Sequence, residues 1–187
     1  MEVKCLKIEG WADALFAMKA TRNPEIEYLG DDNPEPSTEL KERMLSALHS
    51  PIRLVNIFFQ IKLPNKTMGH ITRHSIGVNW FVSTLRSDLT NNIDLEITRV
   101  TERNVFVRFN LEALIKFCRV RTCGVAEKEA REFANMLIDA YLRTEFKHTS
   151  FTPFFSADCG RCTEVFSDCG NRRASQQAVR EKLMRDH

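Results

Sequence analysis

The stretch HSPIRLVNIFFQIKLPNKTMGHITRHS, residues 49–75, contains the clearest strand signal in the chain. A strand is expected over residues 52–63, and within 56–63 apolar side chains alternate with mostly polar ones. Successive side chains of a strand point to opposite faces, so this alternation predicts a strand with one face in the core. Pro64 ends it, because proline has no N–H to donate to a neighbouring strand. The expected buried residues are Ile57, Phe59, Ile61 and Leu63.

On the N-terminal side, the pattern predicts a short strand, two helices and a loop. Residues 2–8 read as a strand, and apolar residues at helical spacing predict a helix from Trp11 to about Arg22. Residues 23–36 are rich in Pro, Asp, Asn and Gly and predict a loop. Ser37 is a good N-cap for a helix that continues to Leu48.

On the C-terminal side, residues 65–88 are expected to be helical with a break near Gly77. Alternating apolar residues at 93–97 and 105–109 predict a hairpin that turns near Thr101 to Asn104. Two amphipathic helices follow, and the second has the strongest helical pattern of the chain. A polar helix is expected after Arg173. The two apolar stripes comprise Leu111, Leu114, Ile115 and Cys118, and then Ala130, Phe133, Ala134, Leu137, Ile138 and Tyr141.

Length and composition predict one compact domain. The chain has 187 residues, of which 43% are hydrophobic, and a formal net charge of +2. This charge is too small to favour a nucleic acid polymer, and no apolar run is long enough to favour a membrane. We therefore expect a cytoplasmic protein with a domain over residues 1–150. A cysteine-containing extension over residues 151–187 is expected to pack on the same domain.

Candidate functional residues gather between His49 and Arg86. The step His49-Ser50-Pro51 precedes the main strand, and Arg73-His74 follows it. In the expected helix, Ser83 and Arg86 lie one turn apart and share a face. A hydroxyl group and a guanidinium group on one face would bind an anion, because arginine offers paired donors to phosphate oxygens.

In order and spacing these residues resemble motifs of the flavin-dependent thymidylate synthases. That family has a His-x-Ser/Thr-Pro-like step, a strand, an Arg-His-Arg motif and then a serine. The chain has Arg73-His74-Ser75, with Ser83 after the same interval of seven residues. Asn110, Val120-Arg121 and the sequence EAREFA at residues 129–134 then follow in family order. The resemblance covers roughly residues 46–145.

The resemblance implies an α+β fold, in which an antiparallel sheet packs with helices, and a homotetramer with FAD bound between subunits. The family reduces FAD with NADPH, takes a carbon from methylenetetrahydrofolate and methylates dUMP, a pyrimidine deoxynucleotide. By position, the residues implied to bind FAD are Ser50, Arg73, His74, Ser75 and Arg121. Those implied to bind the nucleotide are His70, Ser83, Arg86, Arg103 and Arg131, with Arg73 also near it. Arg131 would act catalytically by polarising a carbonyl of the base; otherwise it is a surface arginine.

Several positions depart from the family pattern. Ser75 replaces an arginine, His70 replaces a glutamine, and no carboxylate follows Asn79. The interval from Ser83 to Arg86 is also one residue longer than usual. These differences favour a divergent member that modifies dUMP or a related pyrimidine nucleotide. The alternative is a catalytically silent homologue that binds a nucleotide or a protein partner.

The cysteines suggest a separate hypothesis. Cys159 and Cys162 form a CxxC pair, and Cys123 and Cys169 each precede a glycine. Four thiolates on such turns would hold a structural zinc ion, although a redox pair and unligated or disulfide-bonded cysteines stay open. Zinc would also suit a third reading of the chain, a small zinc-stabilised binding module. Cys5 and Cys118 lie in apolar stretches and are expected to be core thiols.

Overall fold

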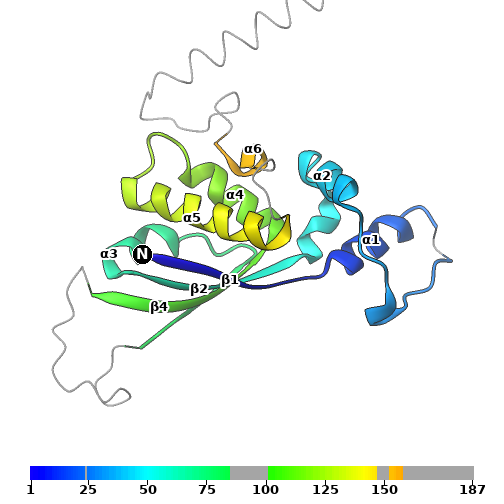
Figure 1. The fold of residues 1–187 in the computed structure, drawn as a ribbon, viewed down its shortest axis with the longest axis horizontal. Coiled ribbons are helices and arrows are strands. Elements are labelled where there is room, and N and C mark those ends of the chain that lie inside the picture. The colour runs from blue at the N-terminus through cyan, green and yellow to red at the C-terminus, as the bar shows by residue number, and fades with distance from the viewer. Residues whose placement is uncertain (24, 85–100, 147–151, 158–187) are drawn as a thin grey trace, which may run out of the picture.

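The computed structural model describes residues 1–23, 25–84, 101–146 and 152–157, which form a four-stranded antiparallel sheet packed with helices (Figure 1). This is the α+β fold that the resemblance implied. The sheet order is β1-β2-β4-β3, so β4 lies between β2 and β3. The strands are β1 (Glu2–Glu9), β2 (Asn56–Pro64), β3 (Val78–Val82) and β4 (Glu102–Asn110).

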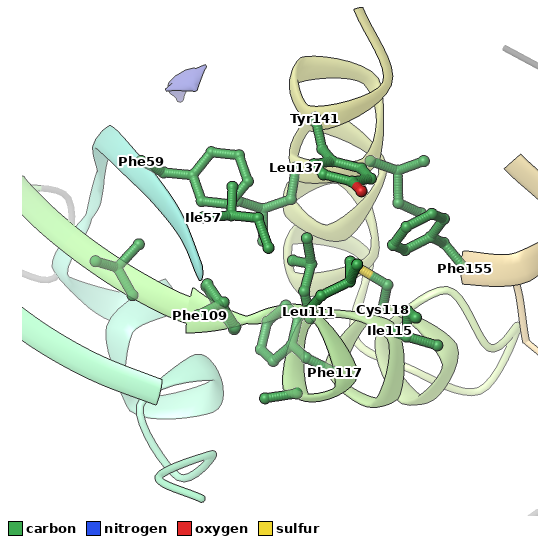
Figure 2. Packing of buried hydrophobic residues seen from close by; sticks show 14 of the residues in the cluster. Ile57, Phe59, Phe109, Leu111, Ile115, Phe117, Cys118, Leu137, Tyr141 and Phe155 are labelled. Atoms are coloured by element: carbon green, nitrogen blue, oxygen red, sulfur yellow. The ribbon is translucent and has the colours of Figure 1, made fainter. Parts of the chain in front are cut away.

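The predicted alternation of β2 is confirmed, and it builds the core. The four expected residues of β2 are at most 1% exposed. Ile57 pairs with Phe109 of β4, and Phe59 pairs with Val107. Figure 2 shows Ile57, Phe59 and Phe109 pointing toward Leu137 and Tyr141 of the long helix. Burial of such large apolar side chains is the main favourable term in folding, at about 1.5–3 kcal/mol for each side chain.

Two helices cover this face of the sheet. They are α4 (Leu111–Arg121) and α5 (Lys128–Glu145), which lie together above the strands (Figure 1). Their apolar stripes are buried as the sequence predicted, and Cys118 is fully buried between them. Cys5 is only partly buried. The other face carries the aromatic rings of Phe58, Phe81 and Phe106, with Phe81 59% and Phe106 40% exposed.

The N-terminal predictions are also confirmed. Helix α1 (Trp11–Ala20) follows β1, and α2 (Thr38–Ser46) begins after the loop, which contains the short 3-10 helix η1 (Gly30–Asp32). Ser37 caps α2 by accepting a hydrogen bond from the Leu40 N–H at 3.3 Å. Both α-helices lie beyond one end of the sheet (Figure 1). Buried Lys41 of α2 joins them to the core through an ion pair with Glu145 at 2.5 Å.

The main strand begins later than predicted. Residues Ser50–Leu54 form the 3-10 helix η2, and β2 starts only at Asn56. Pro51 at the start of η2 fixes a φ angle that suits a helical turn, and it has no N–H to pair with a neighbouring strand. Pro51 and Ile52 of η2 therefore enter the core from a helical turn instead of from the sheet, whereas Leu54 is exposed.

The prediction of helix over residues 65–88 is wrong for most of its described part. Helix α3 (Asn65–Ile71) ends before Arg73, and β3 follows at Val78. The break near Gly77 is real, since this glycine has a φ of 74°. Val78, Trp80 and Val82 pair with the phenylalanine- and valine-rich β4, so sheet pairing overrides a weak helical signal. Residues 85–88 lie outside the described part of the chain.

The predicted hairpin turn near Thr101 to Asn104 is also wrong. Strand β4 begins at Glu102, and Arg103 and Asn104 already pair with β2. The strand over 105–109 is confirmed, whereas its expected partner at 93–97 lies outside the described residues. Among the described residues β4 pairs with β2 and β3, and its inward side chains are buried in the core with those of α4 and α5.

The described part of the extension is a short helix, α6 (Thr152–Phe155), which contacts α4 and α5. Phe155 is fully buried there, and the Arg119 side chain donates to the Phe154 carbonyl at 2.9 Å. The helix expected after Arg173 lies outside the described residues, and the division at residue 150 stays a prediction. Among the described helices, none combines the length and apolar character needed to cross a membrane.

Candidate functional site

A cavity of about 310 Å³ lies between the turn that follows α3 and the first turns of α4. Its size is at the lower end of the range for small-molecule sites in proteins. Polar and apolar groups share the wall, so it suits a ligand with both a ring and hydrogen-bonding groups. The lining residues are Arg73, His74, Ser75, Ile76, Val78, Asn110, Glu112, Ala113, Lys116 and Phe117. Three consecutive motif residues predicted from the sequence, Arg73 to Ser75, are therefore together on one wall.

Gly77 fixes this turn against α4. Its carbonyl oxygen accepts a hydrogen bond from the Asn110 N–H at 2.8 Å. A Cβ atom at Gly77 would lie 2.5 Å from the Asn110 side-chain nitrogen, so only glycine fits there. The Asn110 side-chain oxygen in turn caps α4 by accepting from the Ala113 N–H at 2.8 Å. The beginning of α4, where the helix dipole is positive, therefore opens onto the cavity.

His74 is held on both sides. Its ring packs edge-on against Phe117 at 4.9 Å between centroids, and its carbonyl oxygen accepts from the Trp80 indole N–H at 2.9 Å. Burial, and to a smaller extent the charge of Arg121, lowers the pKa of His74 below its ordinary value of 6.5. The imidazole is therefore neutral at neutral pH, and it offers one donor and one acceptor.

Arg121, at the end of α4, lies in the electrostatic field of Arg73, and its own charge lowers the pKa of His74. Its guanidinium donates to the His70 carbonyl at 2.6 Å, while its buried Nε–H has no hydrogen-bond partner among the described residues. Burial and the like charge of Arg73 lower the pKa of Arg121, and Glu127 offsets this only in part. Two arginines close enough to repel each other favour an anion between or beside them.

Two cavity residues, Glu112 and Lys116, were not singled out by the sequence analysis. The Glu112 carboxylate pairs with Lys116 at 2.7 Å and accepts hydrogen bonds from the Arg53 side chain of η2. These two cations lower the pKa of Glu112, with Arg53 the larger cause. In the sequence the pair is an ordinary i,i+4 pair on a helix surface, and only the place of Glu112 two residues after Asn110 could have indicated it.

The other predicted binding residues do not line the cavity in this chain. Ser50 is exposed on η2, and His70 is exposed at the end of α3. Ser83 was expected on a helix but lies just after strand β3. The Arg103 guanidinium donates to the Ser83 carbonyl at 2.5 Å, so these two residues do meet at the β3–β4 edge. Arg86 lies outside the described residues.

Arg131 lies on the first turns of α5. Its guanidinium donates to the Gly124 carbonyl at 3.0 Å, which ties α5 to the turn after α4. Arg131 does not line the cavity, and the catalytic role expected for it stays a prediction.

The zinc hypothesis falls mostly outside the described residues. Cys123 is partly buried in the turn after α4, whereas Cys159, Cys162 and Cys169 are not in the described part of the chain. Within the described ranges, no three His, Cys, Asp or Glu side chains gather in a metal-binding group.

Comparison with solved structures identifies the fold. A flavin-dependent thymidylate synthase, ThyX, from Helicobacter pylori, complexed with FAD and dUMP, matches with a TM-score of 0.58 at 18% identity. The match covers 75% of this chain and 93% of that one. The chain has the flavin-dependent thymidylate synthase fold. A second Helicobacter pylori ThyX structure, also with FAD and dUMP, gives 0.61 at 16% identity, covering 83% and 99%.

The same fold is also found in a UMP/dUMP methylase, PolB, from Streptomyces cacaoi, bound with 5-Br dUMP. It matches with a TM-score of 0.57 at 15% identity, over 83% of this chain and 96% of that one. Neither a protein-family model nor a curated protein sequence matches the chain. The chain thus shares its fold with proteins to which it is at most 18% identical in sequence.

Proposed function

We propose that the protein binds FAD and a pyrimidine nucleotide and methylates the base with a carbon from methylenetetrahydrofolate. The observation that carries this proposal is the positive charge at the cavity. Arg73 lines it, and Arg121 is close enough to Arg73 to have its pKa lowered. Such repulsion costs free energy in folding, and a bound phosphate group would remove it.

The residues present fit a flavin. The Nε–H of Arg121, which has no partner within the described part of the chain, and the exposed side chains of Arg73 and Ser75 supply donors for a pyrophosphate or for the polar edge of a ring. Phe117 and Val78 supply an apolar surface on which a ring can rest. When bound, FAD would carry electrons from NADPH. In place of the family's arginine, Ser75 offers one hydroxyl, so we expect weaker retention of FAD.

In the proposed reaction, a methyl group replaces the hydrogen on C5 of the pyrimidine, and that hydrogen leaves as a proton. The methyl carbon comes from methylenetetrahydrofolate, and NADPH supplies the two electrons that reduce it. The neutral His74 would serve as a hydrogen-bond partner for a ligand carbonyl or N–H. We assign carbonyl polarisation at the base to Arg131 because a fixed positive group stabilises the charge that develops there.

We further propose that the complete site needs a second copy of the chain. A cavity of about 310 Å³ would hold a nucleotide-sized part of a ligand and not the whole of FAD. Arg103 and Arg131 lie away from the cavity of their own chain, which fits sites shared between subunits. The exposed rings of Phe81 and Phe106 offer an apolar sheet face for the contact. The molar mass of the purified protein, measured by light scattering after size-exclusion chromatography, tests whether copies of the chain associate. A monomer at micromolar concentration would contradict the shared site.

Binding measurements on arginine variants test the site assignment. Arg73→Ala should weaken FAD binding by about ten- to a hundredfold, since it removes a charged hydrogen bond of about 1.5–3 kcal/mol. Arg131→Ala should lose nucleotide turnover and keep FAD. Arg143→Ala is the matched control, because this α5 arginine is exposed and pairs only with Asp139 among the described residues. Unchanged FAD affinity in Arg73→Ala would show that the cavity is not the flavin site.

A further inference from the structure

Glu112 is an acidic group in a cavity whose other charged lining residues are cationic. Its side chain is only 16% exposed, whereas those of its partners Arg53 and Lys116 are 61% and 63% exposed. Two cations and one carboxylate leave a net charge of +1 on this cluster, next to the positive beginning of α4. The two cations therefore already bind a negatively charged oxygen group, which is the protein's own Glu112 carboxylate.

The geometry of the cluster matches that of an anion subsite. Glu112 uses one oxygen for the Arg53 Nε–H, and its other oxygen accepts from the Arg53 terminal nitrogen at 3.3 Å and from Lys116 at 2.7 Å. A phosphate-bearing ligand has the same kind of oxygen acceptors: a nucleotide monophosphate offers three terminal oxygens and a flavin pyrophosphate four, and each carries more negative charge in total than one carboxylate. Because Lys116 and Arg53 have long, exposed side chains, both can turn from Glu112 to such a group without disturbing the core.

We propose that Arg53, Glu112 and Lys116 form an exchange subsite, in which the phosphate of a ligand replaces Glu112 as the partner of the two cations. This inference rests on the proposed binding of a phosphate-bearing ligand in the cavity. It adds that Lys116 of α4 and Arg53 of η2 bind the phosphate beside Glu112, and that Glu112 sets the affinity by competing for them. The phosphate is either the pyrophosphate of the flavin or the monophosphate of the nucleotide.

The test is a double-mutant cycle measured by titration calorimetry, with Glu112→Gln, Lys116→Met and the double variant. Glu112→Gln keeps the shape of the side chain and removes the competing charge. It should tighten binding of a phosphate-bearing probe by about three- to tenfold, as expected for one charge a few ångströms away in a partly hydrated site. Lys116→Met alone should have a smaller effect, because Glu112 already holds this lysine. In the double variant, most of the gain should disappear.

Paired probes identify the phosphate. If the subsite binds the flavin pyrophosphate, Glu112→Gln should bind FAD more tightly and riboflavin with unchanged affinity. If it binds the nucleotide phosphate, Glu112→Gln should bind dUMP more tightly and deoxyuridine with unchanged affinity. The matched control is Glu132→Gln with Lys128→Met, an i,i+4 pair on α5 that does not line the cavity, and it should change nothing. Melting curves on each variant establish that it is folded.

Two results would overturn the subsite. The first is that Glu112→Gln binds the phosphate-bearing probe with unchanged or lower affinity. The second is that the double variant keeps the full gain in affinity shown by Glu112→Gln. Inorganic pyrophosphate, used as a third probe, separates this failure from failure of the proposed function. A chain that binds neither FAD nor dUMP, yet binds pyrophosphate more tightly through Lys116 in Glu112→Gln, would contradict the function and keep the subsite.

Discussion

Replacing Gly77 with alanine should destabilise the protein and disrupt the cavity together, because this glycine joins the Arg73-His74-Ser75 turn to α4. Its φ of 74° is a conformation that residues with a Cβ atom rarely adopt. The added Cβ would lie 2.5 Å from the Asn110 side-chain nitrogen and 2.9 Å from the Ala113 Cβ. The turn must therefore move, because the alanine would have a strained backbone conformation and its Cβ atom would clash with α4 and its N-cap residue.

The magnitude follows from two terms. The left-handed conformation costs an alanine about 1–2 kcal/mol relative to glycine. Moving the Asn110 side chain breaks its cap on the Ala113 N–H, which contributes about 1 kcal/mol. The expected loss is therefore about 2–3 kcal/mol in the free energy of unfolding. Gly30 is a matched control, since it has a φ of 61° but no atom within 4 Å of an added Cβ.

Urea denaturation followed by tryptophan fluorescence measures both variants. Gly30→Ala should lose only the free energy that the left-handed conformation costs an alanine. Gly77→Ala should therefore be less stable than Gly30→Ala by about 1 kcal/mol, the contribution of the lost Asn110 cap. Gly77→Ala should also bind FAD less tightly than Gly30→Ala does. Equal losses of stability in the two variants would refute the close approach of the turn to α4 as the cause.

Three further predictions concern single positions. Gly69→Ala should raise stability by roughly 0.5–1 kcal/mol, because Gly69 lies within α3 with open space around it, and a lower urea midpoint would contradict this. Because the pKa of His74 is lowered, an NMR titration should find the ring half-protonated below pH 6.5. Its contribution to the free energy of unfolding should be complete above pH 6.5 and be lost as the pH falls through the lowered pKa. A pKa above 6.5 would show that the ring is not desolvated. Cys118 is fully buried with a strongly raised pKa, so the native protein should be alkylated at Cys123 well before Cys118, and equal rates by peptide mass spectrometry would refute this.

The elements that could be predicted from the sequence are those whose periodicity is complete within the element. The β2 alternation from Ile57 to Leu63 and the α5 stripe from Ala130 to Tyr141 each reveal a buried face without reference to any neighbour. Strand β3 could not be found in this way. Its five residues are too short to establish a period, and what makes them a strand is their pairing with β4.

The candidate site was predictable in part for the same reason. Arg73, His74 and Ser75 are consecutive in the sequence, so they lie close together in any fold. Glu112 and Lys116 join them only because Gly77 holds that turn against the start of α4, a contact between distant segments. Ser83 was expected on a helix but lies just after β3, where its carbonyl accepts from Arg103, and its expected neighbour Arg86 lies outside the described residues.

The central claim is that this chain methylates a pyrimidine nucleotide, and product analysis tests it most directly. The purified protein would be incubated with FAD, NADPH, methylenetetrahydrofolate and, in separate reactions, dUMP, UMP, dCMP and dTMP. Mass spectrometry should find one nucleotide heavier by a single methyl group, only when all co-substrates are present, and Arg73→Ala should reduce its yield. A protein that binds FAD and nucleotide yet methylates none of the four would contradict the claim and favour a silent binding homologue.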